Sequence, residues 1–170
     1  MEYLFYHACK LVTPFNPHTG VTLDQILQAV DAHGQPEELH WPYLVHLPAD
    51  LSTYLPPSIT APIYRRTGQV LTSAPVDEIS QDLNNDRPSL LIFRSTEPFI
   101  KAGRTSPVAW SSTDQLLPPH AVLAVGLGDN QAKRVVRVRN SWGAGWADGG
   151  YAWLTEEFID KTFVALVRMV

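Results

Sequence analysis

The chain has 170 residues, of which 45% are hydrophobic and 18% are charged. This composition is typical of a folded domain with a substantial core, and it excludes wholesale disorder. The net charge of −4 argues against nucleic acid or an anionic membrane surface as a partner, and no apolar run approaches the roughly 20 residues that span a bilayer.

The N-terminus and the cysteine content bear on the compartment. Met1-Glu-Tyr-Leu-Phe-Tyr has neither a basic leader nor a small-residue cleavage site, so it does not resemble a secretory signal. The sequence contains one cysteine, which excludes an internal disulfide and favours a reducing compartment. We therefore expect a cytoplasmic protein.

Two helices are predicted in the first part of the chain. Residues Glu2 to Val12 form a short helical pattern that places Cys9 among apolar neighbours, where a small buried hydrophobe is expected. After a loop, a capping box formed by Thr22 and Gln25 opens a second helix of about three turns, which ends at Gly34.

Proline dominates the segment from Val45 to Pro62, which cannot be a continuous helix. We interpret it as the crossing between a small helical lobe, about residues 1–57, and a β-rich lobe, about residues 58–170. Pro75 opens one helix of the second lobe, since proline fits a first helical turn, and Thr155 opens a short capped turn. Residues Glu97 to Leu117 are predicted to be mostly loop, anchored by Phe99 and Trp110. Hydrophobic runs predict strands at Ile63–Arg66, Gln69–Thr72, Ser89–Phe93, Ala121–Val125, Lys133–Arg139, Tyr151–Leu154 and Phe163–Met169.

A histidine and an asparagine flank two of these predicted strands. The apolar run His120-Ala-Val-Leu-Ala-Val-Gly-Leu-Gly is followed by a basic strand and then by Asn140-Ser-Trp-Gly-Ala-Gly-Trp. An imidazole that moves protons needs a polar partner to set its tautomer and ring plane, and an asparagine carbonyl can accept from one ring N–H. Trp142 and Trp146 are placed to shield this hydrogen bond from water. Glycines on both sides allow tight turns: Gly126, Gly128, Gly143 and Gly145.

This arrangement resembles the C-terminal half of papain-like (C1 family) cysteine peptidases. The histidine block, the asparagine block and Gly149-Gly150-Tyr151 occur in the order of that family. A weaker match, to the segment after the nucleophile helix in bacterial members, lies at Glu2-Tyr-Leu-Phe-Tyr-His-Ala, Gly20-Val-Thr-Leu and Pro36-Glu-Glu-Leu-His-Trp-Pro-Tyr43. The resemblance implies an α+β papain-like fold with a helical lobe, an antiparallel β-barrel-like lobe, and His120 and Asn140 as catalytic residues.

The family's nucleophile has no counterpart in this sequence. Papain-like enzymes carry it near the mature N-terminus in a Cys-Gly-Ser-Cys-Trp type motif, preceded by a glutamine that donates to the oxyanion. Neither feature is present, and Cys9 lies on a different helix in the family-like register. We therefore expect the nucleophile helix to be missing from this chain.

Other polar residues are weaker candidates for a functional site. Five further histidines show no metal-ligand spacing, so no metal or cofactor is expected; they are His7, His18, His33, His40 and His46. Three serines are poor candidates for a replacement nucleophile: Ser111, Ser112 and Ser141. The alternative for His120 is a satisfied histidine in a core hairpin.

Two functions follow from the resemblance. In the first, the chain is the greater part of a peptidase that hydrolyses peptides or proteins, is expected to be inactive alone, and takes its cysteine from an upstream stretch or a partner chain. In the second, it is a non-catalytic binding or regulatory module. In either case the missing helix should expose an apolar face, disfavoured in water by about 25 cal/mol per Å², so we expect self-association or a partner chain.

Overall fold

The computed structural model describes residues 2–44 and 46–170. Val45, where the proline-rich crossing was predicted to begin, lies outside the described residues. The chain divides into two compact units: the first runs to Gly68 and includes Val170, and the second comprises Gln69–Met169. None of the described helices is long and apolar enough to cross a membrane.

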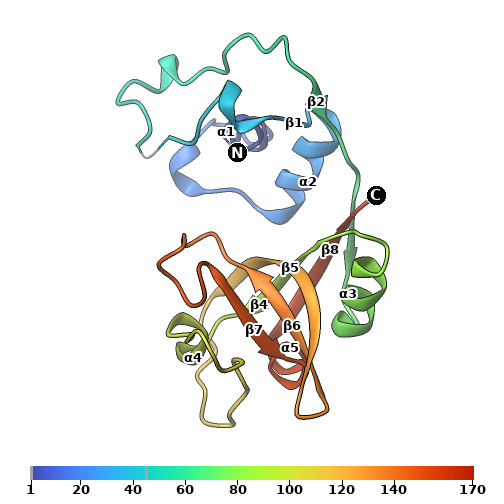
Figure 1. Ribbon diagram of the computed structural model, residues 1–170. Coiled ribbons are helices and arrows are strands. Elements are labelled where there is room, and N and C mark those ends of the chain that lie inside the picture. The colour runs from blue at the N-terminus through green and yellow to red at the C-terminus, as the bar shows by residue number, and fades with distance from the viewer. Residues whose placement is uncertain (1, 45) are drawn as a thin grey trace. The chain divides into compact units, whose positions relative to one another are not determined.

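The first unit is built on two helices, α1 (Glu2–Lys10) and α2 (Leu23–Ala32), drawn in blue in Figure 1. The predicted capping box starts α2: the Thr22 side chain accepts from the Gln25 amide, and the Gln25 side chain accepts from the Thr22 amide. Gly34 ends the helix with a φ of +70°, and a Cβ there would lie 2.6 Å from the Tyr64 carbonyl oxygen. Both helix boundaries therefore follow from sequence signals.

Aromatic side chains form the core of the first unit. Tyr6, Trp41 and Tyr54 are buried together, and the rings of Tyr6 and Tyr54 meet edge to face at 5.4 Å. The Tyr54 hydroxyl donates to the buried Glu2 carboxylate at 2.5 Å, and the Leu44 amide donates to the same carboxylate at 3.2 Å. These bonds join the start of α1 to the proline-rich segment.

The unit boundary differs from the lobe boundary near residues 57 and 58 that the sequence suggested. Residues 58–68 belong to the first unit because β2 (Ile63–Tyr64) pairs with β1 (Gln35–Pro36). Gly68 also lies against Leu27 of α2. The proline content indicated a crossing, but the short antiparallel pairing that holds its far end was not visible in the sequence.

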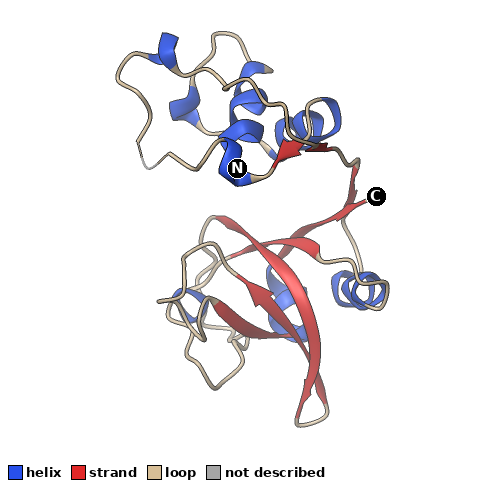
Figure 2. Ribbon diagram, turned by 45° about the horizontal axis from the view of Figure 1, so that its top comes forward, coloured by secondary structure: helices blue, strands red, loops and turns tan. Residues whose placement is uncertain are grey.

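The second unit contains a six-stranded sheet in the order β3-β8-β4-β5-β6-β7, seen as one twisted layer in Figure 2. The pairs β4–β5, β4–β8, β5–β6 and β6–β7 are antiparallel. This confirms the predicted α+β class with a large antiparallel sheet. The strands are β3 (Gly68–Leu71), β4 (Ser89–Arg94), β5 (Pro119–Asn130), β6 (Lys133–Arg139), β7 (Tyr151–Thr155) and β8 (Phe163–Met169).

Three helices complete the second unit: α3 (Pro75–Leu83), α4 (Glu97–Ile100) and α5 (Glu156–Thr162). Pro75 occupies the first turn of α3 as predicted, and Thr155 caps α5 by accepting from the Phe158 amide at 3.2 Å. Apolar residues of α3 and α5 share one core with the sheet. The short α4 interrupts a segment that was predicted to be mostly loop.

Candidate active site

His120 lies near the start of β5, opposite Phe93 of β4 in the antiparallel register. Asn140 follows the last residue of β6, which pairs with β5. The return of the chain from β5 into β6 therefore brings the two side chains together. His120 Nε2 lies 2.9 Å from Asn140 Oδ1, so the contact expected from the sequence is present.

A backbone amide identifies which atom of Asn140 faces the imidazole. The Ser141 N–H donates to Asn140 Oδ1 at 2.8 Å, so that atom must be the carboxamide oxygen. An oxygen accepts only, and His120 Nε2 must therefore carry the proton of their shared hydrogen bond. In the neutral ring Nδ1 then holds the lone pair, and no described residue forms a hydrogen bond with Nδ1. The geometry presents Nδ1 as a base.

The tryptophans of the asparagine block enclose the hydrogen bond. The Trp142 ring lies 4.7 Å from the imidazole, centroid to centroid, and Trp142 is 45% exposed. Trp146 is buried and meets Trp142 edge to face at 5.7 Å, so it supports the outer ring. Asn140 is buried beneath them. An interior hydrogen bond of this kind competes less with water than an exposed one.

The loop between Asn140 and β7 holds these rings in place. The Asn140 amide donates to the Gly150 carbonyl at 2.9 Å, and the Gly150 amide donates to the Trp146 carbonyl at 2.8 Å. Gly150 has a φ of +94°, and a Cβ there would lie 3.2 Å from the Gly143 carbonyl oxygen. Glycine is therefore needed at this closure.

Phe99 is part of the site, although the sequence indicated only a loop anchor. It is fully buried on α4, and its ring lies 5.7 Å from His120. Thr96 caps α4 and Pro98 occupies its first turn, a start signal that would have predicted this short helix. Contact between Phe99 and His120 depends on tertiary packing and had no sequence signal.

Comparisons with known proteins identify the family. The sequence matches the family model described as Papain family cysteine protease over residues 19–164, which include His120 and Asn140. The chain belongs to the papain family of cysteine proteases.

Two curated relatives of this papain-family chain match over short segments. Ananain of Ananas comosus is 49% identical over 39 residues, which are 22% of this chain and 11% of ananain. The KDEL-tailed cysteine endopeptidase CEP2 of Arabidopsis thaliana is 50% identical over 38 residues, 22% of this chain and 10% of the relative. Each match spans about a tenth of the relative's length.

Solved structures show the same fold over almost the whole chain. Xylellain, a cysteine protease from Xylella fastidiosa, has a TM-score of 0.69 at 24% identity, covering 99% of this chain and 68% of xylellain. The digestive procathepsin L 3 of Tenebrio molitor has a TM-score of 0.70 at 17% identity, covering 99% of this chain and 54% of the neighbour. The bromelain protease of Ananas comosus, in complex with the E64 inhibitor, has a TM-score of 0.68 at 16% identity, covering 99% and 76%.

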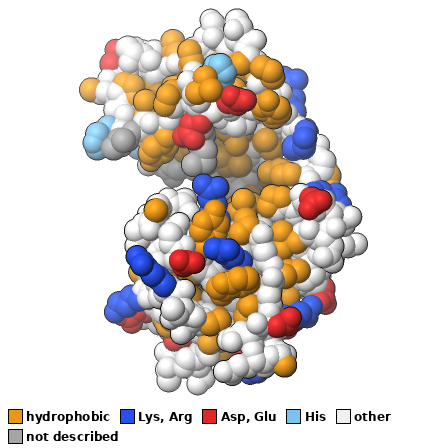
Figure 3. Space-filling view, in the orientation of Figure 1, with side chains coloured by type: hydrophobic (Ala, Val, Ile, Leu, Met, Phe, Trp, Pro, Cys, Tyr) orange, Lys and Arg blue, Asp and Glu red, His pale blue; other side chains and the backbone are white. Residues whose placement is uncertain are grey.

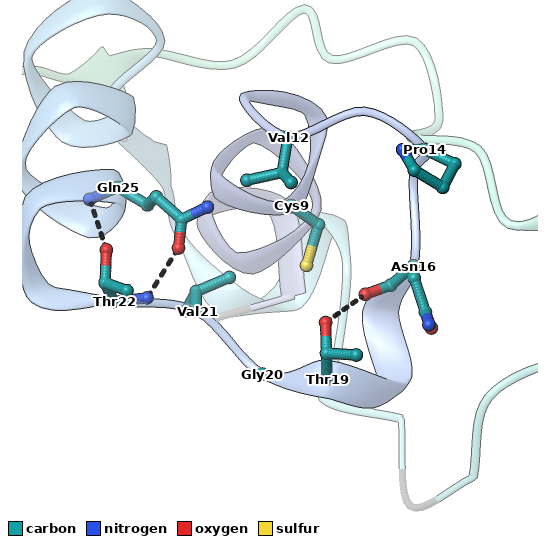
Figure 4. Close-up of a pocket in the computed structure, with 9 residues that line it drawn as sticks. All are labelled: Cys9, Val12, Pro14, Asn16, Thr19, Gly20, Val21, Thr22 and Gln25. Carbon is teal, nitrogen blue, oxygen red and sulfur yellow. Dashed lines mark hydrogen bonds between the residues drawn. The ribbon is translucent and has the colours of Figure 1, made fainter.

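Cys9, the one cysteine of this papain-family chain, belongs to the first unit, whereas His120 belongs to the second. Its side chain is buried as expected, and burial, followed by the negative charge of Glu2, raises the pKa of the thiol above its ordinary value. Figure 4 shows the sulfur directed into a pocket of about 290 Å³ between α1 and the loop before α2. A thiol in this setting is held in the unreactive protonated form.

Two of the other polar candidates, Ser111 and His7, form contacts with different residues. The Ser111 hydroxyl is within hydrogen-bond distance of the Thr113 hydroxyl at 2.9 Å. His7 stacks on His33 in the first unit, with ring centroids 3.9 Å apart. Across residues 2–44 and 46–170, no group of three or more His, Cys, Asp or Glu side chains is arranged to hold a metal ion.

Proposed function

We propose that this chain supplies the proton-transfer half of a papain-type cysteine peptidase acting on peptides or proteins. His120 is the base and acid, Asn140 orients it, and Trp142 and Trp146 exclude water. The thiol comes from a polypeptide segment outside residues 1–170. The chain alone is therefore expected to be inactive.

One observation carries the proposal. The Ser141 amide identifies Asn140 Oδ1 as oxygen, and this oxygen holds the proton on His120 Nε2 and leaves Nδ1 free. A histidine with one nitrogen oriented and the other free matches the arrangement that nucleophilic catalysis by cysteine requires.

The proposed roles follow from that proton arrangement. Nδ1 of His120 takes the S–H proton, and the resulting thiolate attacks the peptide carbonyl carbon. The imidazolium then returns the proton to the leaving nitrogen as the C–N bond breaks, which leaves a thioester that water hydrolyses. Because the Cys9 thiol is buried and its pKa is raised, it is unsuited to this step.

A chimera tests this function. A segment that carries the glutamine and the Cys-Gly-Ser-Cys-Trp type motif of papain-like enzymes is fused before Glu2, and hydrolysis of a fluorogenic peptide is measured. We expect hydrolysis that depends on the added cysteine. Replacing His120 by alanine should lower kcat/KM by about 10²–10⁴-fold, since general acid–base transfer contributes that much.

Three control variants of the chimera sharpen the result. Replacing the added cysteine by alanine should abolish turnover, and Asn140→Ala should reduce kcat. His18→Ala, a change at an exposed histidine, should leave the rate unchanged. A folded chimera with no cysteine-dependent turnover, or with turnover that is the same after His120→Ala, would refute the proposed role of His120.

We further propose that an apolar groove of the first unit is covered by a second copy or by a partner chain. The groove has a volume of about 460 Å³, and Leu4, Phe5, Ile26, Tyr43 and Leu44 are among its mainly apolar lining residues. Figure 3 shows apolar side chains gathered on the visible surface of each unit. Apolar patches of this kind on a protein surface are typical of association sites.

The second candidate function is a non-catalytic papain-like module used for binding or regulation. The burial of Cys9 favours it, because the described chain then holds a base without an accessible thiol. In this case the His120–Asn140 hydrogen bond stabilises the fold only. A well-folded chimera that binds a peptide substrate without turning it over would favour this module over the peptidase.

A further inference from the structure

We infer that Phe99 is a positioning residue for His120, and that the short helix α4 holds Phe99 against the imidazole. The inference rests on the proposed function of His120 as the base, and it identifies what keeps the imidazole in line with Asn140. Phe99 touches neither the substrate nor the reacting atoms in this account. It acts through the ring of His120.

The packing of Phe99 is the first observation. Its ring lies 5.7 Å from the imidazole of His120, 5.7 Å from Trp142 and 5.1 Å from Trp146. It also meets Phe93, which is opposite His120 in the sheet, edge to face at 4.9 Å. A single buried ring therefore contacts the base, both shielding tryptophans and the neighbouring strand.

The attachment of α4 is the second observation. Trp146 Nε1 donates to the Ile100 carbonyl at 3.1 Å, which joins the end of α4 to the asparagine block. Before α4, the Leu117 amide donates to the Ser95 carbonyl at 2.8 Å, and the Ser95 amide donates to the Pro118 carbonyl at 3.3 Å. These bonds link α4 to the segment that leads directly into His120. Hydrogen bonds before α4 and at its end therefore hold Phe99 in place.

The consequence concerns the rotation of the imidazole. The rings of Trp142 and Phe99 each contact the imidazole of His120, and they also contact each other at 5.7 Å, so a rotation of the imidazole about its χ2 bond changes its packing against both rings. A smaller side chain at residue 99 leaves space and an opening for water, which competes for the Nε2 proton. Asn140 Oδ1 is then no longer the single acceptor available to the Nε2 proton, and the preference for the Nε2–H tautomer over the Nδ1–H tautomer falls.

The test follows the His120 side-chain nitrogens by ¹⁵N–¹H correlation spectra of the full chain near neutral pH. The variant is Phe99→Leu. The control is Phe158→Leu, because Phe158 is equally buried in the same core and packs on Phe93 at 5.6 Å, without a ring contact to His120. We expect the wild type and Phe158→Leu to show the Nε2–H tautomer alone, and Phe99→Leu to show both tautomers.

A second variant keeps the inference testable if Phe99→Leu does not fold. Trp146→Phe retains a ring but removes the donor to Ile100, and it should produce the same mixture of tautomers to a smaller extent. The positioning role would be overturned if folded Phe99→Leu kept the single Nε2–H tautomer, or if Phe158→Leu changed to the same extent. If only Trp146→Phe folds, a single unchanged tautomer in that variant would also overturn it.

The readout separates this inference from the proposed function. It records where the proton of His120 lies and needs no nucleophile. An inactive chimera combined with the expected tautomer mixture would refute the peptidase and leave the positioning by Phe99 intact. An active chimera with an unperturbed tautomer in Phe99→Leu would refute the positioning alone.

Discussion

At the scale of single residues, one oxygen of Asn140 has two donors. Both the His120 ring and the Ser141 amide point to Oδ1, whereas Asn140 Nδ2 is buried without a hydrogen-bond partner in the described chain. A buried amide donor without a partner costs about 1–3 kcal/mol. The orientation of the carboxamide therefore depends on the turn at Ser141, which forces the oxygen toward the imidazole.

Cys9 allows a prediction at the same scale. Because its side chain is buried and its pKa is raised, the native chain should react with iodoacetamide at pH 7.5 about 10²-fold or more slowly than the chain in urea. Mass spectrometry over time measures both rates. Rapid labelling of the native chain, or covalent capture of Cys9 by a thiol-directed peptidase inhibitor, would show that Cys9 is a reactive thiol and not a core residue.

At the scale of elements, an ion pair joins β8 to α3. Arg168 of β8 pairs with the buried Asp82 and donates to Glu78 at 2.7 Å, and these bonds raise the pKa of the Arg168 guanidinium. The Ser89 hydroxyl donates to Asp82 at 2.6 Å. The buried Asp82 carboxylate therefore has its counter-ion only while Arg168 is present.

We predict that Arg168→Ala lowers the free energy of unfolding by about 3–5 kcal/mol, because it leaves a buried carboxylate without its counter-ion. Arg134→Ala is the control: Arg134 pairs with Asp77 and Glu156, but its side chain is 44% exposed, so the loss should stay within about 1 kcal/mol. Urea denaturation followed by circular dichroism compares them. Equal losses in the two variants would contradict the special role of the buried pair.

The packing of α1 on α2 predicts a dependence on pH. Burial first, then the charges of His33 and Lys10, lower the pKa of His7 from 6.5 to about 4. The unfolded chain therefore binds this proton more tightly than the folded chain. The stabilisation from neutral His7 is complete above about pH 6.5 and is lost as the pH falls toward about 4.

We expect His7→Gln to reduce this loss of stability between pH 6.5 and pH 4, and the exposed-site control His18→Gln to keep it. Urea midpoints measured at several pH values in that window give the slopes. A slope in His7→Gln as steep as that of the wild type would mean that His7 is not the titrating group.

Local signals predicted most of the elements, for reasons that particular residues make clear. Three helix starts were marked by local signals: the Thr22–Gln25 capping box, Pro75 and Thr155. These signals depend on residues close together in the sequence, so they do not depend on the tertiary fold. The extent of β5 to Asn130 was missed because its second half contains two glycines and ends in Asp129-Asn130, and this half depends on pairing with β6.

The candidate site was predictable in part, for a related reason. His120 and Asn140 stand at the ends of two predicted strands, so their meeting followed from the hairpin. The contact of Phe99 with the imidazole and the donation by Ser141 depend on tertiary packing and on turn conformation. No pattern in the sequence encodes them directly.

At the scale of the whole molecule, the open question is what covers the apolar groove of the first unit. We predict that the purified chain forms dimers or larger assemblies, or binds a partner chain, because water disfavours the exposed apolar lining. Light scattering measures the mass. A monodisperse monomer with no complementary subunit would contradict this prediction.

Two variants locate the association. Tyr43→Glu places a charge in the groove at a residue that is 62% exposed, and Leu39→Glu is the control, since Leu39 is 69% exposed and lies outside the groove lining. Only the first should shift the mass toward the monomer. A shift in both, or in the control alone, would place the contact elsewhere on the unit.

We infer that Asn140 holds the proton of His120 on Nε2, so that Nδ1 is available as a base. The most direct measurement is the ¹⁵N–¹H side-chain spectrum of His120 near neutral pH, in the wild type and in Asn140→Ala. We expect the Nε2–H tautomer alone in the wild type and a mixture of tautomers in Asn140→Ala. A wild-type ring protonated on Nδ1, or a tautomer indifferent to the loss of Asn140, would contradict it.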